Sequence, residues 1–231
     1  GDAQASLPAI IEEVKRLSGS IGQPTLDARA AKWRQMHLAE RRASIETARY
    51  GWNKSPITTA RLYGELWEVV KDKDWAHVSF DGFQSNWAKR LWPMTKHYHF
   101  HGSSGAAGIG YGAPAAVGAA LAHREHGRLA VNVQKDGDLM FGPGVLWTAA
   151  HHGIPLLSVM HNNRAYHAER QIVQRVANHR NRGVESSSLI GNSLDNPAID
   201  FAKMAESMGL WSAGTITEPG DLRAELMRAV D

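Results

Sequence analysis

The fold is decided by two stretches, residues 129–138, which read LAVNVQKDGD, and residues 156–163, which read LLSVMHNN. The runs Leu129–Gln134 and Leu156–His161 are typical of buried strands, and they open the two stretches. Between them, Pro143–His152 has the pattern of a helix with proline in its first turn. Strands that alternate with helices predict an α/β fold built on a parallel sheet.

Polar residues follow both predicted strands, with Asp136 after the first and Asn163 after the second. Ligands of an open parallel sheet bind beyond the carboxyl ends of its strands. If the two strands are neighbours, a carboxylate and a carboxamide face the same small volume. Mg²⁺ prefers one or two protein oxygen ligands together with phosphate oxygens. The sequence therefore predicts a Mg²⁺ site in which Asp136, the Asn163 side chain and a backbone carbonyl leave room for a diphosphate.

The rest of the chain is divided by changes in pattern. We expect residues 1–22 to be the end of a preceding domain, residues 23–55 to be a linker, and residues 56–231 to form the diphosphate- and Mg²⁺-binding domain. The first segment predicts an amphipathic helix with Ser6 as its N-cap and Gly19 behind it. A second, charge-rich helix is expected over residues 27–49.

Within the domain, more elements are expected around the two decisive stretches. These are helices near 62–70, 87–92, 201–208 and 219–231, strands near 76–80 and 211–216, and a long irregular segment at 175–197 that could serve as a lid.

Composition limits the class of protein. The 231 residues are 43% hydrophobic, carry a formal net charge of +3 and include no cysteine, which excludes disulfides and thiolate metal sites. No apolar run reaches the length of a membrane span, and no secretory signal opens the chain. We therefore expect a cytoplasmic protein that has neither nucleic acid nor a membrane as a partner.

The two polar clusters also carry a family resemblance. The segment Lys135-Asp136-Gly137-Asp138, followed 27 positions after Asp136 by the second residue of Asn162-Asn163, resembles the Gly-Asp-Gly and Asn-Asn motif of thiamine-diphosphate enzymes. Val145–Ala150 and Ile199-Asp200-Phe201 are similar to benzoylformate decarboxylase, within a family that includes acetolactate synthase. The resemblance implies the thiamine-diphosphate-binding fold, with helices on both faces of a parallel sheet.

The resemblance also implies roles for single residues. Asp136 and Asn163 would bind Mg²⁺ through their side chains, and Ala165 would bind it through its carbonyl. Asp138 replaces a serine or similar residue that meets the diphosphate. The carbonyl of Ala107 would accept a hydrogen bond from the aminopyrimidine, and Ile109 would wedge the cofactor into a bent shape. The other residues expected to contact the cofactor are Gln84, Ser85, Gly137 and Tyr166.

The implied activity is decarboxylation of 2-oxo acids, carboligation of the product, or both. Glu169, six positions after Asn163, is the candidate catalytic residue, because one branch of the family has a glutamate there. The resemblance further implies an N-terminal pyrimidine-binding domain or polypeptide as a partner, a homodimer or homotetramer, and a small 2-oxo acid as substrate. A flavin is not expected, and the chain alone should be nearly inactive.

Other interpretations remain open at this point. Gly108, Gly110 and Gly112 could belong to a dinucleotide-binding loop, but their spacing is G-x-G-x-G and not G-x-G-x-x-G. An acetolactate-synthase-like carboligase is one alternative to a decarboxylase. A cofactor-binding or assembly domain without activity is another, because Lys135 stands where the family has glycine.

Overall fold

The chain consists of two units, Gly1–Thr47 and Ala48–Asp231, in the computed structural model. The structure describes residues 1–79, 86–102, 108–183 and 188–231. Two helices, α1 (Ala3–Ser18) and α2 (Gln23–Arg49), account for the first unit and the start of the second.

The first helix begins earlier than its sequence predicts. Asp2, and not Ser6, is the N-cap of α1, because the Asp2 carboxylate reaches the Ala5 N–H at 2.7 Å. Ser6 lies inside the helix, where its hydroxyl donates to the Asp2 carbonyl. The expected Gly19 does follow the last turn. The apolar side chains of α1 remain about half exposed.

The second unit is built on a parallel sheet of three described strands, β1 (Trp75–His77), β2 (Leu129–Lys135) and β3 (Leu156–His161), in that order. β3 is paired with β2 along its whole length, from Leu156 opposite Ala130 to His161 opposite Lys135. The predicted parallel sheet is confirmed, and the condition that these two strands are neighbours is met. Their carboxyl ends, with the polar residues that follow, lie at the same edge of the sheet.

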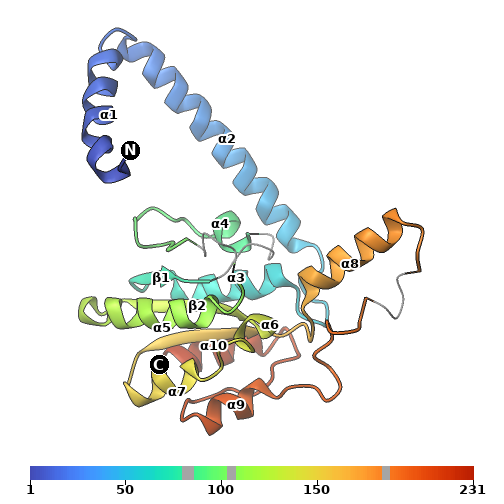
Figure 1. Ribbon diagram of the computed structural model, residues 1–231. Helices are drawn as coiled ribbons and strands as arrows, with labels where there is room; N and C mark the ends of the chain where they lie inside the picture. Colours follow the sequence, from blue (N-terminus) through green and yellow to red (C-terminus); the bar gives the residue numbers. More distant parts are fainter. Residues whose placement is uncertain (80–85, 103–107, 184–187) are drawn as a thin grey trace. The chain divides into compact units, whose positions relative to one another are not determined.

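Helices cover both faces of this sheet, as Figure 1 shows, so the predicted α/β class is confirmed. Val131 and Val133 of β2 pack into one core with α3, α4 and α10, while Ala130 packs into another with α5 and α7. Because side chains alternate along a strand, Asn132 and Gln134 share the α5 face with Ala130. The helices of this unit are α3 (Thr59–Val70), α4 (Trp87–Leu91), α5 (Gly112–His123), the 3₁₀ turn η1 (Arg124–His126), α6 (Asp136–Leu139), α7 (Val145–His151), α8 (His167–His179), α9 (Phe201–Ser207) and α10 (Leu222–Val230).

Two sequence predictions about the C-terminal third are wrong in part. Residues 211–216 form no strand, because Gly214 has φ +80° and its N–H bonds to the Ser212 hydroxyl, which turns the segment locally. The segment 175–197 is not irregular throughout, since α8 continues to His179.

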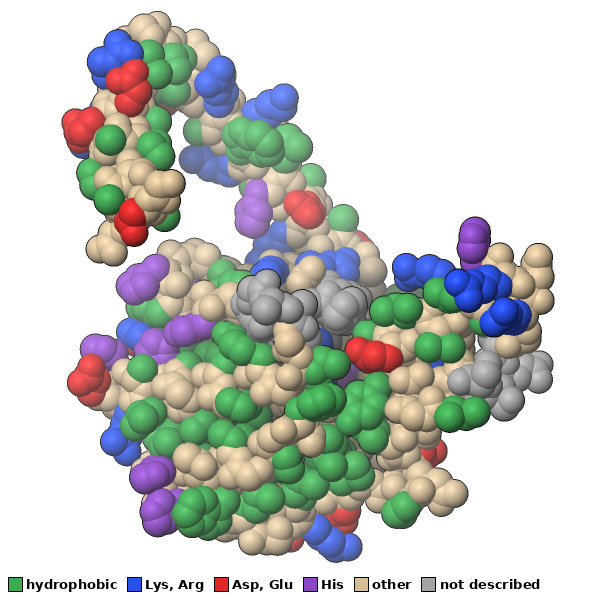
Figure 2. Space-filling view, in the orientation of Figure 1, with side chains coloured by type: hydrophobic (Ala, Val, Ile, Leu, Met, Phe, Trp, Pro, Cys, Tyr) green, Lys and Arg blue, Asp and Glu red, His purple; other side chains and the backbone are tan. Residues whose placement is uncertain are grey.

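The surface of the second unit carries a basic region at the C-terminal end of α8, visible in Figure 2, where Arg175, Arg180 and Arg182 are exposed. Of the helices in the described residues, none combines the length and apolar character needed to span a membrane.

Candidate metal and diphosphate site

The two predicted side-chain ligands converge beyond the carboxyl end of the sheet. Asp136 opens α6 directly after β2, and Asn163 lies two residues after β3. Asp136 Oδ2 accepts a hydrogen bond from the Ala165 N–H at 3.2 Å, and Asn163 Oδ1 accepts from the same N–H at 3.0 Å. Both oxygens therefore lie within hydrogen-bonding distance of one nitrogen atom. A carboxylate and a carboxamide held this close form a donor set that suits a hard cation.

The electrostatics of the site also favour a cation. The Asp136 side chain is 1% exposed, and this burial raises its pKa, while the backbone amides of Gly137, Ala165 and Arg164 act in the opposite direction. Burial also lowers the pKa of His161, so the neighbouring imidazole is held toward its neutral form. A carboxylate that has lost its water recovers stability when a cation binds next to it.

A tight turn after β3 aims the Ala165 amide at Asp136. Arg164 adopts the left-handed conformation, with φ +57°, and its N–H donates to Asn162 Oδ1 at 3.0 Å. The far side of the turn is fixed by two backbone hydrogen bonds, from Leu194 N–H to the Arg164 carbonyl and from Tyr166 N–H to the Asn192 carbonyl. The turn is thus held from both sides.

Gly137 allows α6, which follows β2, to touch the loop after β3. A Cβ added at Gly137 would stand 2.6 Å from Cδ1 of Tyr166. The Tyr166 ring in turn meets the Phe141 ring edge-on, with 6.0 Å between ring centroids. Only glycine leaves room for this approach, and Gly137 and Tyr166, both predicted cofactor contacts, are brought together beside Asp136.

The carboxylate of Asp138 contacts the glycine-rich segment that precedes α5. Its Oδ1 accepts from the Gly110 N–H at 2.7 Å, and its Oδ2 accepts from the Gly112 N–H at 3.0 Å and from Gln134 Nε2 at 2.8 Å. The side chain is 5% exposed. Ile109, the predicted wedge, directly precedes Gly110 and is 42% exposed. The structure therefore joins Asp138 and Ile109 through one short turn.

A row of buried polar side chains, not expected from the sequence, lies under this site. Asn132 Nδ2 donates to Gln134 Oε1 at 3.0 Å and approaches the Ser158 hydroxyl at 3.4 Å, while the Ser79 hydroxyl accepts from the Val133 N–H at 2.8 Å. A signal was present in the sequence. Asn132 and Gln134 are polar residues two positions apart inside an otherwise apolar strand, and such residues share one face.

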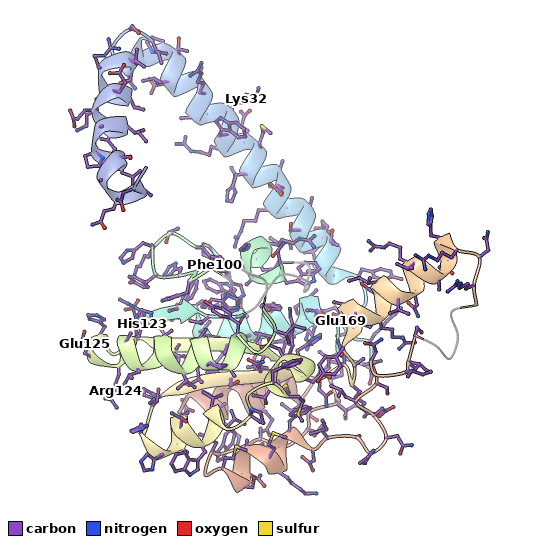
Figure 3. The ribbon with its side chains drawn as sticks, in the orientation of Figure 1. Lys32, Phe100, His123, Arg124, Glu125 and Glu169 are labelled. Atoms are coloured by element: carbon purple, nitrogen blue, oxygen red, sulfur yellow. The ribbon has the colours of Figure 1, made fainter. Side chains whose placement is uncertain are left out.

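The remaining predicted site residues are Glu169, at the start of α8, and three that lie outside the described residues. Gln84, Ser85 and Ala107 lie outside the described residues. Glu169 stands in the first turn of α8 and is partly buried. Figure 3 shows Glu169 near the start of that helix, at the other end of the unit from His123 at the end of α5.

A parallel sheet with candidate oxygen ligands and close glycine turns beyond its carboxyl edge is typical of phosphate- and metal-binding α/β domains. Residues 82–231 match the family described as "Thiamine pyrophosphate enzyme, C-terminal TPP binding domain". The chain belongs to this family, and its cofactor is thiamine diphosphate.

Relatives and solved structures agree with this assignment. The acetolactate synthase large subunit of Haemophilus influenzae is 33% identical over 95% of this chain and 36% of its own length. Benzoylformate decarboxylase of Pseudomonas aeruginosa is 34% identical over 46% of this chain and 18% of its own length. The thiamine diphosphate-dependent 4-hydroxybenzoylformate decarboxylase of Rhodococcus jostii superposes with a TM-score of 0.64 and 25% identity, covering 77% of this chain and 31% of that one. The chain thus spans about a third of the length of the acetolactate synthase large subunits that align with 95% and 100% of it.

Proposed function

We propose that this chain supplies the Mg²⁺ and diphosphate site of a thiamine-diphosphate-dependent lyase that decarboxylates 2-oxo acids. The observation that carries the proposal is the convergence of Asp136 Oδ2 and Asn163 Oδ1 on the single N–H of Ala165. Two oxygens from neighbouring strand ends leave most of an octahedral Mg²⁺ shell to diphosphate and water oxygens.

The backbone supports Ala165 as the third ligand. Ala165 pairs with Ser193 in an isolated antiparallel bridge, so its backbone is locally extended. In an extended segment the N–H and C=O of one residue face the same side. Because the Ala165 N–H faces Asp136, its carbonyl is directed toward the same side, where a metal ion would lie.

The residues of this chain divide the work around the cofactor. When bound, thiamine diphosphate supplies the electron sink for loss of CO₂ from a 2-oxo acid. Asp136 and Asn163 would hold the metal ion, and Ile109 and Tyr166 would provide apolar surface that excludes water from the cofactor. Glu169, partly buried at the start of α8, holds a proton and transfers it to or from the substrate.

Carboligation is a second candidate activity. Acetolactate synthase large subunits align with 95% and 100% of this chain, whereas benzoylformate decarboxylase of Pseudomonas aeruginosa aligns with 46%. This coverage favours an enzyme that joins the decarboxylated fragment to a second carbonyl compound. Product analysis with pyruvate separates the two activities, because a carboligase yields acetolactate and a simple decarboxylase yields acetaldehyde.

A partner is part of the proposal. The chain corresponds to about a third of its full-length relatives, so an N-terminal pyrimidine-binding domain or polypeptide would complete the cofactor site. We propose that the working unit is a cytoplasmic homodimer or homotetramer that contains this part, and that residues 1–231 alone turn over slowly.

Calorimetric titration of thiamine diphosphate into the chain, with and without Mg²⁺, tests the metal assignment. Wild-type protein should show saturable binding that requires Mg²⁺. Asp136→Asn should lose it, because the remaining ligands are neutral oxygens that cannot offset the dehydration of Mg²⁺. Asp221→Asn is the matched control, since Asp221 is exposed at the start of α10 and its side chain makes no capping hydrogen bond.

The same titration addresses the inactive alternative suggested by Lys135. Absence of saturable binding in the wild type would favour an assembly domain. Equal affinity of Asp136→Asn and Asp221→Asn would instead show that the cofactor binds without Asp136, which contradicts the proposed site.

A further inference from the structure

We propose that Asp138 is a positioning residue that fastens the glycine turn 110–112 to the end of β2, and that it does not act through contact with the diphosphate. The inference rests on the proposed function only where it concerns cofactor affinity. The anchoring itself is a property of the described residues, and it gives the position after Gly137 a task different from that of the serine expected there by resemblance.

The Asp138 carboxylate is fully engaged with donors of this chain. Three N–H groups point at its two oxygens, from Gly110, Gly112 and Gln134, at 2.7 to 3.0 Å. Hydrogen bonds to a carboxylate are charge-assisted and are among the stronger ones in proteins. The side chain is buried, so its charge is balanced by these donors and not by water.

The orientation of Gln134 is fixed by its neighbours. A carboxylate only accepts, so Gln134 must turn its Nε2 toward Asp138, and it donates from the same nitrogen to the Lys135 carbonyl at 3.1 Å. Its Oε1 then faces Asn132, whose Nδ2 donates at 3.0 Å. The buried row in β2 therefore has one consistent order of donors and acceptors, which ends at the Asp138 carboxylate.

The glycines of the turn match this arrangement. Gly110 has φ +87°, and a Cβ there would lie 2.8 Å from Cβ of Phe141. A Cβ on Gly112 would lie 2.6 Å from Asp138 Oδ2 and 2.8 Å from Gln134 Oε1. A side chain at Gly112 would clash with Asp138 and Gln134, and one at Gly110 would clash with Phe141. The turn can approach the carboxylate because both residues are glycine.

The consequence is a mechanical link between two parts of the site. Asp138 lies two residues after the metal ligand Asp136, in the same short helix α6. Ile109, the proposed wedge under the cofactor, directly precedes the turn that Asp138 holds. The anchor therefore sets the position of the wedge relative to the metal ion. A second carboxylate pointing at the diphosphate would instead repel it, which is a further reason why Asp138 faces the glycine amides.

Residue-resolved hydrogen exchange of the Gly110 and Gly112 amides in the cofactor-free chain tests the anchor directly. In Asp138→Asn the new side-chain NH₂ group is a donor that faces other N–H donors, so hydrogen bonds to the turn are lost. The Gly110 and Gly112 amides should then exchange roughly tenfold faster or more. Amides of α3 serve as an internal reference and should not change. Affinity for thiamine diphosphate with Mg²⁺ should fall by roughly tenfold, because binding must then order the turn.

Two further variants separate this inference from the metal assignment. Gln134→Met removes one donor to Asp138 and keeps the side-chain volume, so exchange at the two glycines should rise by a smaller factor even if Asp138→Asn folds poorly. Asp136→Asn should lose Mg²⁺-dependent binding while leaving Gly110 and Gly112 protected. If Asp138 acted on the diphosphate instead, Asp138→Asn would leave the glycine exchange rates unchanged and alter affinity alone, and that outcome overturns the proposal. Loss of glycine protection in Asp138→Asn with no cofactor binding in the wild type would uphold the anchor and refute the proposed function.

Discussion

Replacing Gly137 with alanine tests whether α6 and the loop after β3 are tightly packed against each other. The added Cβ would stand 2.6 Å from Cδ1 and 2.8 Å from Cε1 of Tyr166, well inside carbon contact distance. The ring must move away from its edge-on contact with Phe141. We expect the free energy of unfolding to fall by about 1–3 kcal/mol, the usual cost of overpacking. Mg²⁺-dependent affinity should fall too, because Tyr166 would displace Ala165.

Urea unfolding and calorimetry measure the two effects, and Gly144→Ala is the matched control. Gly144 has φ −59° and ψ −17°, and a Cβ there meets no atom within 4 Å, so its replacement should change stability by less than about 0.5 kcal/mol. Adding Tyr166→Ala to Gly137→Ala should recover part of the loss, with a coupling of about 1 kcal/mol or more. Equal stabilities of Gly137→Ala and Gly144→Ala, or no coupling to Tyr166, would refute the packing argument.

Two other predictions concern turnover and pH. In the assembled enzyme, Glu169→Gln should slow turnover by roughly 10²-fold while calorimetry shows nearly unchanged cofactor affinity; wild-type turnover would place Glu169 outside the reaction. Burial lowers the pKa of His77 from 6.5 to about 3, so between these pH values the unfolded chain binds one more proton than the folded chain. The free energy of unfolding should therefore decrease as pH falls from 6.5 toward 3, by at most about 1.4 kcal/mol per pH unit. Urea unfolding of His77→Gln should show a shallower slope, and an unchanged slope would assign the effect to other groups.

Much of the geometry of the candidate metal site could be predicted from the sequence because it depends on topology. Two strand patterns joined by a helix imply parallel neighbours, and parallel neighbours bring the residues after them to one edge. Asp136 and Asn163 follow from this rule without knowledge of any side-chain contact. In the strand register Lys135 lies opposite His161, so both strands end at the same edge, as the rule predicts.

The contacts of Asp138 could not be predicted in the same way. Gly110 and Gly112 precede it by 28 and 26 positions, across α5 and β2, so the approach depends on how α5 packs on the sheet. The prediction from local pattern also failed at 211–216, where a strand was expected but Gly214 turns the chain. A β-strand forms only where a neighbouring strand can pair with it, and the residue pattern of a segment does not show whether such a neighbour is present.

Two carboxylates in α6 show how the surroundings assign different tasks to the same chemical group. Asp136 and Asp138 are both almost fully buried, so neither charge is stabilised by bulk water. Asp138 is compensated by fixed donors that include the Gln134 side chain. At Asp136 burial outweighs the backbone amides and raises the pKa, so its ionised form is still under-compensated. Under the proposed function, a divalent cation would supply the missing charge at Asp136 and would have no corresponding role at Asp138. Neutralising Asp136 should therefore remove the cation, whereas neutralising Asp138 should loosen the glycine turn and leave the metal ligands in place.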